Sequence, residues 1–399
     1  ARANPTWGSG RNEDGTKAAK VSTVLEAGDV LYVGGEFTEM VPPGTNVRNK
    51  YATAEPRSYL AALEVATGKL MPWAPVLDGP VHALALSPDG RRLYIGGSFD
   101  VVNGKPAKHV AAFDLTTGQL DPAFRPPVLN SGVRALALHG DRLYAGGNFT
   151  SVGVPDGTEV PRPQLTALDA SDGSLVDWTP PDADDGCYKG QTGEHTSGCD
   201  GIVYDVVVSR DGKLVHAAGD FLNFGSEESG LVTIDAATGE ATEWQGDVDD
   251  RPVFGLSISP ADGHTLYTAA GGAGGRVFTF DPGADDDGEP LWEGRTDGDA
   301  TDVVATAELV FLVGHFDFII LDEDSDCYQY CPDDGNPNRR HLAAFDPANG
   351  NLDGWNATAN TAQGPYFATL GARHLYIAGD FTEINGGPQP GLAQFPAEG

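Results

Sequence analysis

The chain has 399 residues and a formal net charge of −33, with 25 lysine and arginine residues against 58 aspartate and glutamate residues. Such a charge repels nucleic acid and anionic membranes, and no run of about 18 apolar residues is present, so we expect no nucleic-acid partner and no membrane insertion. The hydrophobic fraction of 40% and the 53 glycines favour a turn-rich, all-β globular protein over a disordered chain.

One motif recurs along the chain with varying fidelity, and its copies mark how the sequence is organised. In chain order they are LYVGGEF (31–37), LYIGGSF (93–99), LYAGGNF (143–149), VHAAGDF (215–221), LYTAAGG (266–272), VFLVGHF (310–316) and LYIAGDF (375–381). A motif that returns at variable intervals indicates one supersecondary unit repeated with insertions of different length.

Two further segments accompany most copies of the motif. A short apolar run precedes it, as in VHALAL (81–86) and VRALAL (133–138), which is typical of a strand buried on both faces. A second strand, a glycine turn and an outer strand with an aromatic end follow it, as in HVAAFDLTTGQLDPAF (109–124). Four-stranded units repeated radially form a β-propeller. We therefore predict one all-β domain over residues 1–399, a seven-bladed β-propeller of four-stranded blades.

The two ends of the chain complement each other. The last unit, GLAQFPAEG (391–399), stops before its outer strand, and ANPTWG (3–8) resembles the missing piece. In that alignment Trp7 takes the place of Trp73 or Trp178 in other units. We expect the N-terminal strand to join the last blade and close the ring, because closure removes an open sheet edge.

The string LYIGGSFDVVNGKPAKHVAAFDLTTGQLDPAF (93–124) resembles the repeat of the bacterial delta-60-type propeller proteins, which runs GG-x-F-T-x-V-N-G and then an apolar-Asp strand. The copies at 31, 143 and 375 also match it, whereas the fourth to sixth depart from it. The resemblance implies a secreted or surface propeller of a family that is mostly of unassigned function. It carries no catalytic residues that could be transferred to this chain.

The cysteines favour an oxidising compartment. They form two close pairs, which predicts the disulfides Cys187–Cys199 and Cys327–Cys331. A zinc site with His195 or His341 is the alternative, although neither spacing is the usual one. The start ARANPTWG is typical of a mature N-terminus left after cleavage. We expect a secreted protein, extracellular or at the cell surface.

Long insertions are predicted to gather on one face of the propeller, where the chain enters each innermost strand and leaves each copy of the motif. They are residues 8–19, 38–58, 150–164, 179–201 and 317–340. We call this the insertion-rich face. Elaboration of one face favours a partner there, either a carbohydrate or a protein surface, and neutral drift of the loops is the alternative.

One position in each unit is predicted to open onto the mouth of the central channel. Aligned units give Ser22, His82, Arg134, Tyr204, Phe254, Thr301 and Tyr366, with Asp205 and Asp302 beside them. As a ligand-binding set we select His82, Arg134, Tyr204, Asp205, Phe254, Asp302 and Tyr366, which could stack on and hydrogen-bond a sugar. As a catalytic set, His82, Arg134 and Tyr204 could abstract a proton next to a neutralised carboxylate. The third interpretation is that these residues form an ordinary polar lining of the channel and bind no ligand.

An acidic segment, DEDSDCYQYCPD (322–333), has the spacing of a calcium loop. Counted from Asp322, carboxylates stand at positions 1, 3, 5 and 12, which selects Asp322, Asp324, Asp326 and Asp333 as ligands for Ca²⁺. Cys327 stands where such a loop needs glycine, and a solvated acidic loop is the alternative. No nucleotide or dinucleotide motif is present, so we expect no organic cofactor.

No motif for hydrolysis or metal-assisted catalysis occurs, which favours a protein that is not an enzyme. The best interpretation is a secreted, non-catalytic β-propeller that binds a ligand or partner, including a carbohydrate, on its insertion-rich face. A polysaccharide-cleaving lyase or hydrolase with its site at the channel mouth is the first alternative. A structural subunit of an extracellular assembly is the second.

Overall fold

The structure is a computed structural model. It describes residues 2–10, 12, 18–47, 53–154, 157–181, 187–189, 194–196, 201–221, 230–272, 274–284, 288–321, 335–361 and 364–396. Its regular elements are all strands, so the expected all-β class is confirmed. Within these ranges there is no helix long and apolar enough to span a membrane.

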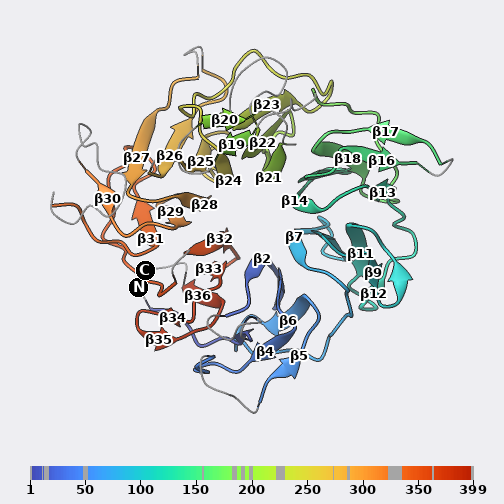
Figure 1. Ribbon diagram of the computed structural model, residues 1–399, viewed down its shortest axis with the longest axis horizontal. Coiled ribbons are helices and arrows are strands. Elements are labelled where there is room, and N and C mark those ends of the chain that lie inside the picture. Colours follow the sequence, from blue (N-terminus) through green and yellow to red (C-terminus); the bar gives the residue numbers. More distant parts are fainter. Residues whose placement is uncertain are drawn as a thin grey trace.

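Antiparallel sheets surround a central axis (Figure 1). In each, an innermost strand pairs with the strand of the recurring motif, which pairs with a third strand. In the described residues these triplets are β2 (Val21–Ala27), β3 (Val30–Gly35) and β6 (Leu60–Glu64); β7 (Val81–Leu86), β8 (Arg92–Gly97) and β11 (Val110–Asp114); β14 (Val133–His139), β15 (Arg142–Gly147) and β18 (Leu165–Asp169); β21 (Ile202–Val208), β22 (Leu214–Asp220) and β23 (Leu231–Asp235); β24 (Val253–Ile258), β25 (Leu266–Ala270) and β26 (Arg276–Phe280); β28 (Ala300–Ala305), β29 (Val310–Gly314) and β31 (Leu342–Phe345); and β32 (Pro365–Leu370), β33 (His374–Gly379) and β36 (Leu392–Pro396). We call them the first to seventh sheets.

The remaining strands are short and lie in the loops or at the outer edge. They are β1 (Gly8–Ser9), β4 (Glu39–Val41), β5 (Glu55–Pro56), β9 (Val101–Val102), β10 (Lys105–Pro106), β12 (Gln119–Leu120), β13 (Val128–Leu129), β16 (Ser151–Gly153), β17 (Glu159–Pro161), β19 (Cys187–Lys189), β20 (Glu194–Thr196), β27 (Trp292–Thr296), β30 (Ile319–Ile320), β34 (Glu383–Ile384) and β35 (Gly387–Pro388). β27 is the longest of them, and it adds to the fifth sheet.

The outer strand of the predicted four-stranded unit is mostly shorter than expected. Only β12 and β27 form it as a strand in the described sheets, and four others reduce it to a single bridge, such as Leu63–Leu70. The outer segment leaves its sheet because its aromatic end packs on the neighbouring one. The indole nitrogen of Trp73 donates to the Gly118 carbonyl at 2.9 Å, and its ring lies 5.1 Å from that of Phe113.

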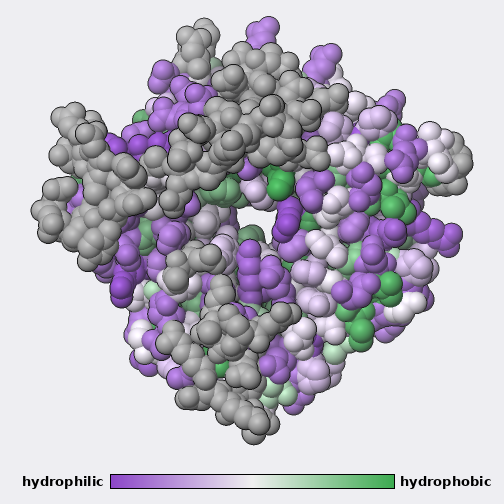
Figure 2. All heavy atoms as spheres, viewed as in Figure 1, coloured by the Kyte–Doolittle hydropathy of each residue, from purple (hydrophilic) through white to green (hydrophobic). Residues whose placement is uncertain are grey.

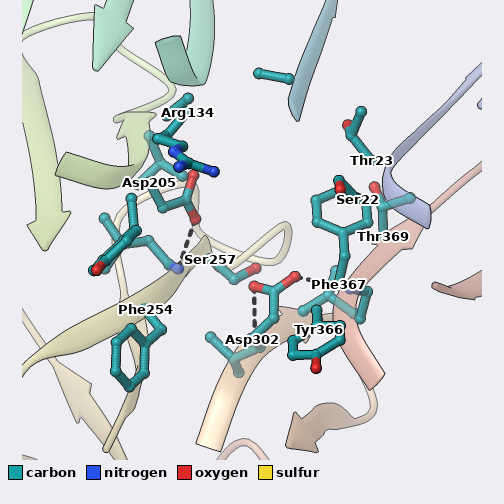
Figure 3. Close-up of a pocket in the computed structure, with 18 of the residues that line it drawn as sticks. Ser22, Thr23, Arg134, Asp205, Phe254, Ser257, Asp302, Tyr366, Phe367 and Thr369 are labelled. Atoms are coloured by element: carbon teal, nitrogen blue, oxygen red, sulfur yellow. Dashed lines mark hydrogen bonds between the residues drawn. The ribbon is translucent and has the colours of Figure 1, made fainter. Parts of the chain in front are cut away.

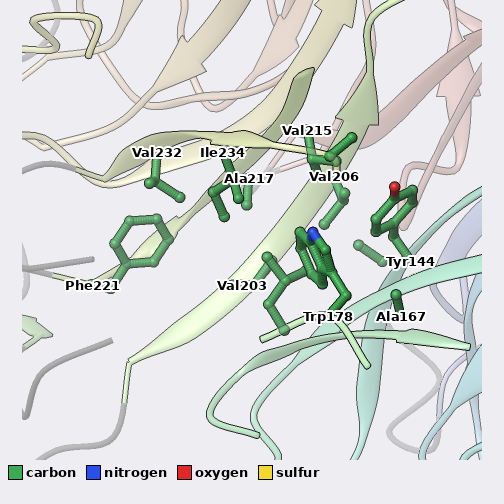
Figure 4. Close-up of a cluster of buried hydrophobic side chains, with 13 residues drawn as sticks. Tyr144, Ala167, Trp178, Val203, Val206, Val215, Ala217, Phe221, Val232 and Ile234 are labelled. Atoms are coloured by element: carbon green, nitrogen blue, oxygen red, sulfur yellow. The ribbon is translucent and has the colours of Figure 1, made fainter. Parts of the chain in front are cut away.

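The hydrophobic core lies between neighbouring sheets. Figure 4 shows Tyr144 and Trp178, from the third unit, facing Val203, Val206 and Val215 of the fourth sheet. Trp178 is 1% exposed, and its ring lies edge-on to Tyr144 at 5.2 Å. Each sheet therefore buries its faces on its two neighbours, which explains how the core grows by addition of units.

The paired glycines of the motif lie where the backbone packs most closely. A Cβ on Gly96 would lie 2.7 Å from the Val133 side chain in the next sheet, and one on Gly97 would lie 2.1 Å from the Pro80 carbonyl oxygen. The aromatic end of the motif is buried as well, at Phe37, Phe99, Phe149, Phe221, Phe316 and Phe381. The motif is thus a packing device and not a glycine-rich binding loop.

The innermost strands follow one another around the axis. Each contacts the next in the order β2, β7, β14, β21, β24, β28 and β32, and β32 also contacts β2. The N- and C-terminal ends lie side by side in Figure 1, and Asn4 forms a bridge with Gln394 of β36.

Candidate functional site

Each innermost strand contains a β-bulge near its start, after its first residue or, in β21, after its second. The register with the motif strand shifts there and leaves one residue without a partner across the ladder. These residues are Ser22, His82, Arg134, Tyr204, Phe254, Thr301 and Tyr366, which we call the mouth residues. They are the seven positions that the aligned repeats placed at the channel mouth. A bulge re-aims the side chain of its extra residue, here away from the sheet and into the channel.

The mouth residues line one cavity of about 970 Å³, together with Asp205 and Asp302. All seven are partly exposed, although each follows a buried residue in its strand. Figure 2 shows the opening at the centre of this face, with both hydrophilic and hydrophobic side chains at its rim. The structure thus brings together the whole selected ligand-binding set, and its binding role stays a prediction.

A basic arc occupies one side of the mouth. The Nη1 atom of Arg134 lies 3.4 Å from Nε2 of His82, and that nitrogen lies 3.1 Å from Oγ of Ser98. Burial, together with the charges of Arg134 and Lys20, lowers the pKa of His82 to about 3. His82 is therefore neutral near pH 7, and the positive charge of this arc comes from Arg134 and Lys20.

Aromatic side chains occupy the other side. The rings of Tyr204 and Phe254 lie 5.5 Å apart, and Nζ of Lys20 lies 4.2 Å from the centre of the Tyr366 ring. Burial raises the pKa of Tyr204 and of Tyr366, and nearby carboxylates raise both further. Both phenols therefore remain protonated and can donate a hydrogen bond across the physiological pH range.

The two aspartates of the set join neighbouring sheets (Figure 3). Asp205 accepts hydrogen bonds from the backbone N–H groups of Val206 and Leu256, both at 2.8 Å, and the second lies on β24 of the next sheet. Asp302 accepts in the same way from Val303 and from Ala368 on β32, both at 2.8 Å. These carboxylates are already used by backbone donors, so their first role is structural.

Their burial also changes their acidity. Removal from water raises the pKa of Asp205 to about 6, although its two backbone hydrogen bonds oppose this. The pKa of Asp302 is raised well above its usual value, first by burial and then by the charge of Asp205. Two carboxyl groups along one channel wall therefore retain protons above the usual range for aspartate.

Sequence reasoning missed a second ring of residues at the mouth. They occupy the sixth position of the motif, between its second glycine and its phenylalanine. In the second copy this is Ser98, whose Oγ lies 3.1 Å from Nε2 of His82. In the fourth copy it is Asp220, whose charge raises the pKa of Tyr204. In the first and seventh copies it holds Glu36 and Asp380, which raise the pKa of Tyr366. The signal was available, because this position of the motif varies most in polarity and charge, from Glu36 to Ser98, Asn148, Asp220, Gly271, His315 and Asp380.

Two groups of predicted residues fall largely outside the part that the structure describes. Asp322, Asp324, Asp326 and Asp333 of the calcium loop lie outside it, as do Cys199, Cys327 and Cys331. Cys187 lies in β19, with only its backbone described. The calcium site and both disulfides therefore stay predictions. In the ranges that are described, no three His, Cys, Asp or Glu residues gather in a way that could hold a metal ion.

Comparisons with known proteins give the fold. Residues 88–124 match the model of a domain of unknown function, the DUF5122 beta-propeller. They include the copy at 93–124, so the resemblance to a family of propeller repeats is confirmed.

The chain is also similar to two solved structures. The crystal structure of the RRP9 WD40 repeats is 11% identical, with a TM-score of 0.59 and 99% of each chain covered. The structure of U3-55K is 11% identical, with a TM-score of 0.55 and 95% of each chain covered. Identities this low carry the fold alone. No curated protein matches the chain in sequence.

Proposed function

We propose that this chain, which resembles the DUF5122 β-propellers, is a non-catalytic, secreted propeller that binds a carbohydrate at the mouth of its central channel. One observation carries the proposal: seven bulges turn seven side chains, of six residue types, toward one cavity. A lining that served the scaffold alone would need no such variety, because the same bulge recurs in every sheet.

The chemistry of the mouth suits a sugar. Tyr204, Phe254 and Tyr366 offer ring faces for stacking, and the protonated phenols and Arg134 donate hydrogen bonds to hydroxyl or carboxylate oxygens. An apolar pocket with a few convergent polar groups is typical of a small-ligand site. Lys20 adds a positive charge beside Tyr366, so a ligand that carries a carboxylate would be favoured over a neutral one.

The same proposal includes a seven-bladed ring completed by the N-terminal segment. Its support is the path of that segment: the Asn4 N–H donates to the Gln394 carbonyl at 2.6 Å, and the Trp7 N–H donates to the Gly68 carbonyl at 2.9 Å. These contacts join it to β36 of the seventh sheet and to the turn that follows β6 of the first.

A secreted or surface location is proposed from the two cysteine pairs, and Ca²⁺ binding from residues 322–333. A cation in that segment and a ligand at the mouth would both act on the insertion-rich face.

His82 argues against the polysaccharide-cleaving alternative. A general base works best with a pKa near the operating pH, and the pKa of His82 is about 3. Tyr204, with a raised pKa, would be a reluctant base as well. Among the residues that the structure describes, no contact favours the structural-subunit alternative over binding.

A glycan array followed by calorimetry on the best ligand tests the proposal. We expect Tyr366→Ala to weaken binding at least about tenfold through loss of stacking. Leu291→Ala, at a side chain 58% exposed outside the mouth, is the matched control and should bind normally. An array without any bound glycan would overturn the carbohydrate proposal, and full affinity in a Tyr204→Ala, Tyr366→Ala double variant would overturn the mouth as its site.

A further inference from the structure

Five apolar side chains line the same cavity as the mouth residues, at a greater depth. Each comes from a different innermost strand, one to three residues further along than the mouth residue of that strand. At a rise of about 3.4 Å per residue, they lie roughly 3–10 Å further along the channel wall. They are Leu25, Leu136, Val207, Val304 and Phe367, which we call the apolar belt.

The side chains of the belt are anchored and still reach the cavity. Each packs one side against the hydrophobic core between two sheets, and each keeps part of its surface exposed. Single exposed apolar side chains are common on protein surfaces, whereas these five gather along one cavity. Their exposed apolar surface is therefore available to a ligand that enters the channel.

Several polar groups at this depth already have protein partners. Oγ of Ser257 accepts a hydrogen bond from the Ala305 N–H at 3.1 Å. Asp205 and Asp302 accept hydrogen bonds from backbone N–H groups of residues that line the cavity (Figure 3), namely Val206, Leu256, Val303 and Ala368. Thr369 contributes a partly exposed hydroxyl to the same wall. The two aspartates thus satisfy donors that an apolar group would otherwise have to strip of water.

We propose that the apolar belt binds a linear alkyl group attached to the sugar that the mouth holds. Mouth and belt residues line one cavity, so a single ligand can contact both. The cavity lies between innermost strands that contact one another in turn, which admits a narrow, unbranched group and excludes a folded partner. The inference rests on the proposed function for the position of the sugar, and it narrows the ligand to an amphipathic glycoside.

Calorimetric titration of the full chain with methyl glucuronide, hexyl glucuronide and sodium hexanoate tests this inference. The first probe presents the sugar alone, the second adds the chain, and the third presents the chain with a carboxylate and no sugar. Each CH₂ group that leaves water strengthens binding up to about fourfold. We therefore expect hexyl glucuronide to bind at least about tenfold more tightly than methyl glucuronide.

A double variant, Val207→Thr with Val304→Thr, replaces two belt side chains by polar ones of nearly the same shape. We expect it to lower the ratio of hexyl to methyl glucuronide affinity at least about threefold. Val128→Thr, at a side chain 46% exposed outside the cavity, is the matched control and should keep the wild-type ratio. If the double variant does not fold, Leu136→Gln takes its place.

The three probes separate failure of the belt from failure of the carbohydrate proposal. Equal affinities for the two glucuronides would overturn the belt and leave the sugar at the mouth standing, and an unchanged ratio in the variants would also overturn the belt. Hexanoate binding that the double variant weakens, without binding of either glucuronide, would support the belt and overturn the sugar. No saturable binding of any probe would overturn the belt, whatever a glycan array shows.

Discussion

The second and fifth sheets follow the same plan and differ where the motif differs. In the second, LYIGGSF puts Gly96 against Val133, buries Phe99 and places Ser98 beside His82. In the fifth, LYTAAGG has glycine in place of the phenylalanine, and Arg276 stands at the start of the third strand. The glycines and the phenylalanine of the faithful copy are explained by packing. The degraded copy keeps the fold and holds charges that packing does not require, so the departures from the repeat are the better guide to function.

The largest expected effect concerns the buried phenylalanine of the second sheet, and it tests whether packing explains the faithful copy of the motif. Phe99→Ala should lower the free energy of unfolding by about 3–5 kcal/mol, because it empties a fully buried site between sheets. Urea denaturation measures the loss. Val76→Ala, at a side chain 60% exposed, should change stability by less than about 0.5 kcal/mol. A loss in Phe99→Ala as small as that of the control would mean that the phenylalanine is not a packing residue.

Deletion of residues 1–9 tests whether the seventh sheet, which contains a faithful copy of the motif, depends on the N-terminal segment for its stability. We expect the free energy of unfolding to fall by about 2–4 kcal/mol, from the lost hydrogen bonds of Asn4 and Trp7 and the lost burial of the Trp7 ring. The melting temperature should fall accordingly. An unchanged melting temperature would contradict closure by the N-terminal segment.

Asp205→Asn tests the raised pKa of a carboxyl group that lines the channel. Asp205, in the fourth sheet, occupies the position that Ala83 occupies in the second sheet. The folded-state pKa of Asp205 is about 6, above the unfolded value, so the folded state binds more protons and wild-type stability falls as pH rises from about 4 to about 6. The Asp205→Asn variant has no carboxyl group at this position, so it lacks this pH-dependent loss of stability. The difference in unfolding free energy between variant and wild type should therefore shift by about 2–3 kcal/mol in favour of the variant over that range.

Urea denaturation at pH 4, 5, 6 and 7 measures that shift. Asp141→Asn, at an exposed aspartate, should show a much flatter difference. A difference for Asp205→Asn that does not change with pH would rule out the raised pKa.

The smallest expected effect compares two neighbouring arginines of the second unit. The guanidinium of Arg92 lies 2.5 Å from the carboxylate of Asp121, whereas Arg91 is exposed. Arg92→Gln should lower the free energy of unfolding by about 0.2–1 kcal/mol through loss of this ion pair, and Arg91→Gln should change it less. Equal losses in paired urea denaturation curves would contradict a stabilising ion pair at Arg92.

The repeat made the fold predictable, and the limits of prediction have physical causes. Alignment of copies located the mouth residues, because each occupies the same place in a recurring strand. It could not show that Asp205 and Asp302 are held by backbone donors of the next sheet, since Leu256 and Ala368 are remote in sequence.

Two other features were hidden for related reasons. The shortened outer strands follow from where Trp73 and its counterparts pack, which depends on the neighbouring unit. The pairing of Arg276 with Arg295 depends on the length of β27, which no motif marks.

The bulges have a consequence for how such a protein can change. Each mouth side chain projects from a residue that makes no pair across its ladder, next to a fully buried neighbour such as Val81 or Val133 that anchors the strand. A substitution at His82 or Arg134 therefore alters the cavity without disturbing the register of the sheet. The innermost strands of the described sheets offer seven such positions that mutation can vary one at a time, so a new ligand preference can arise, or be engineered, on an unchanged scaffold.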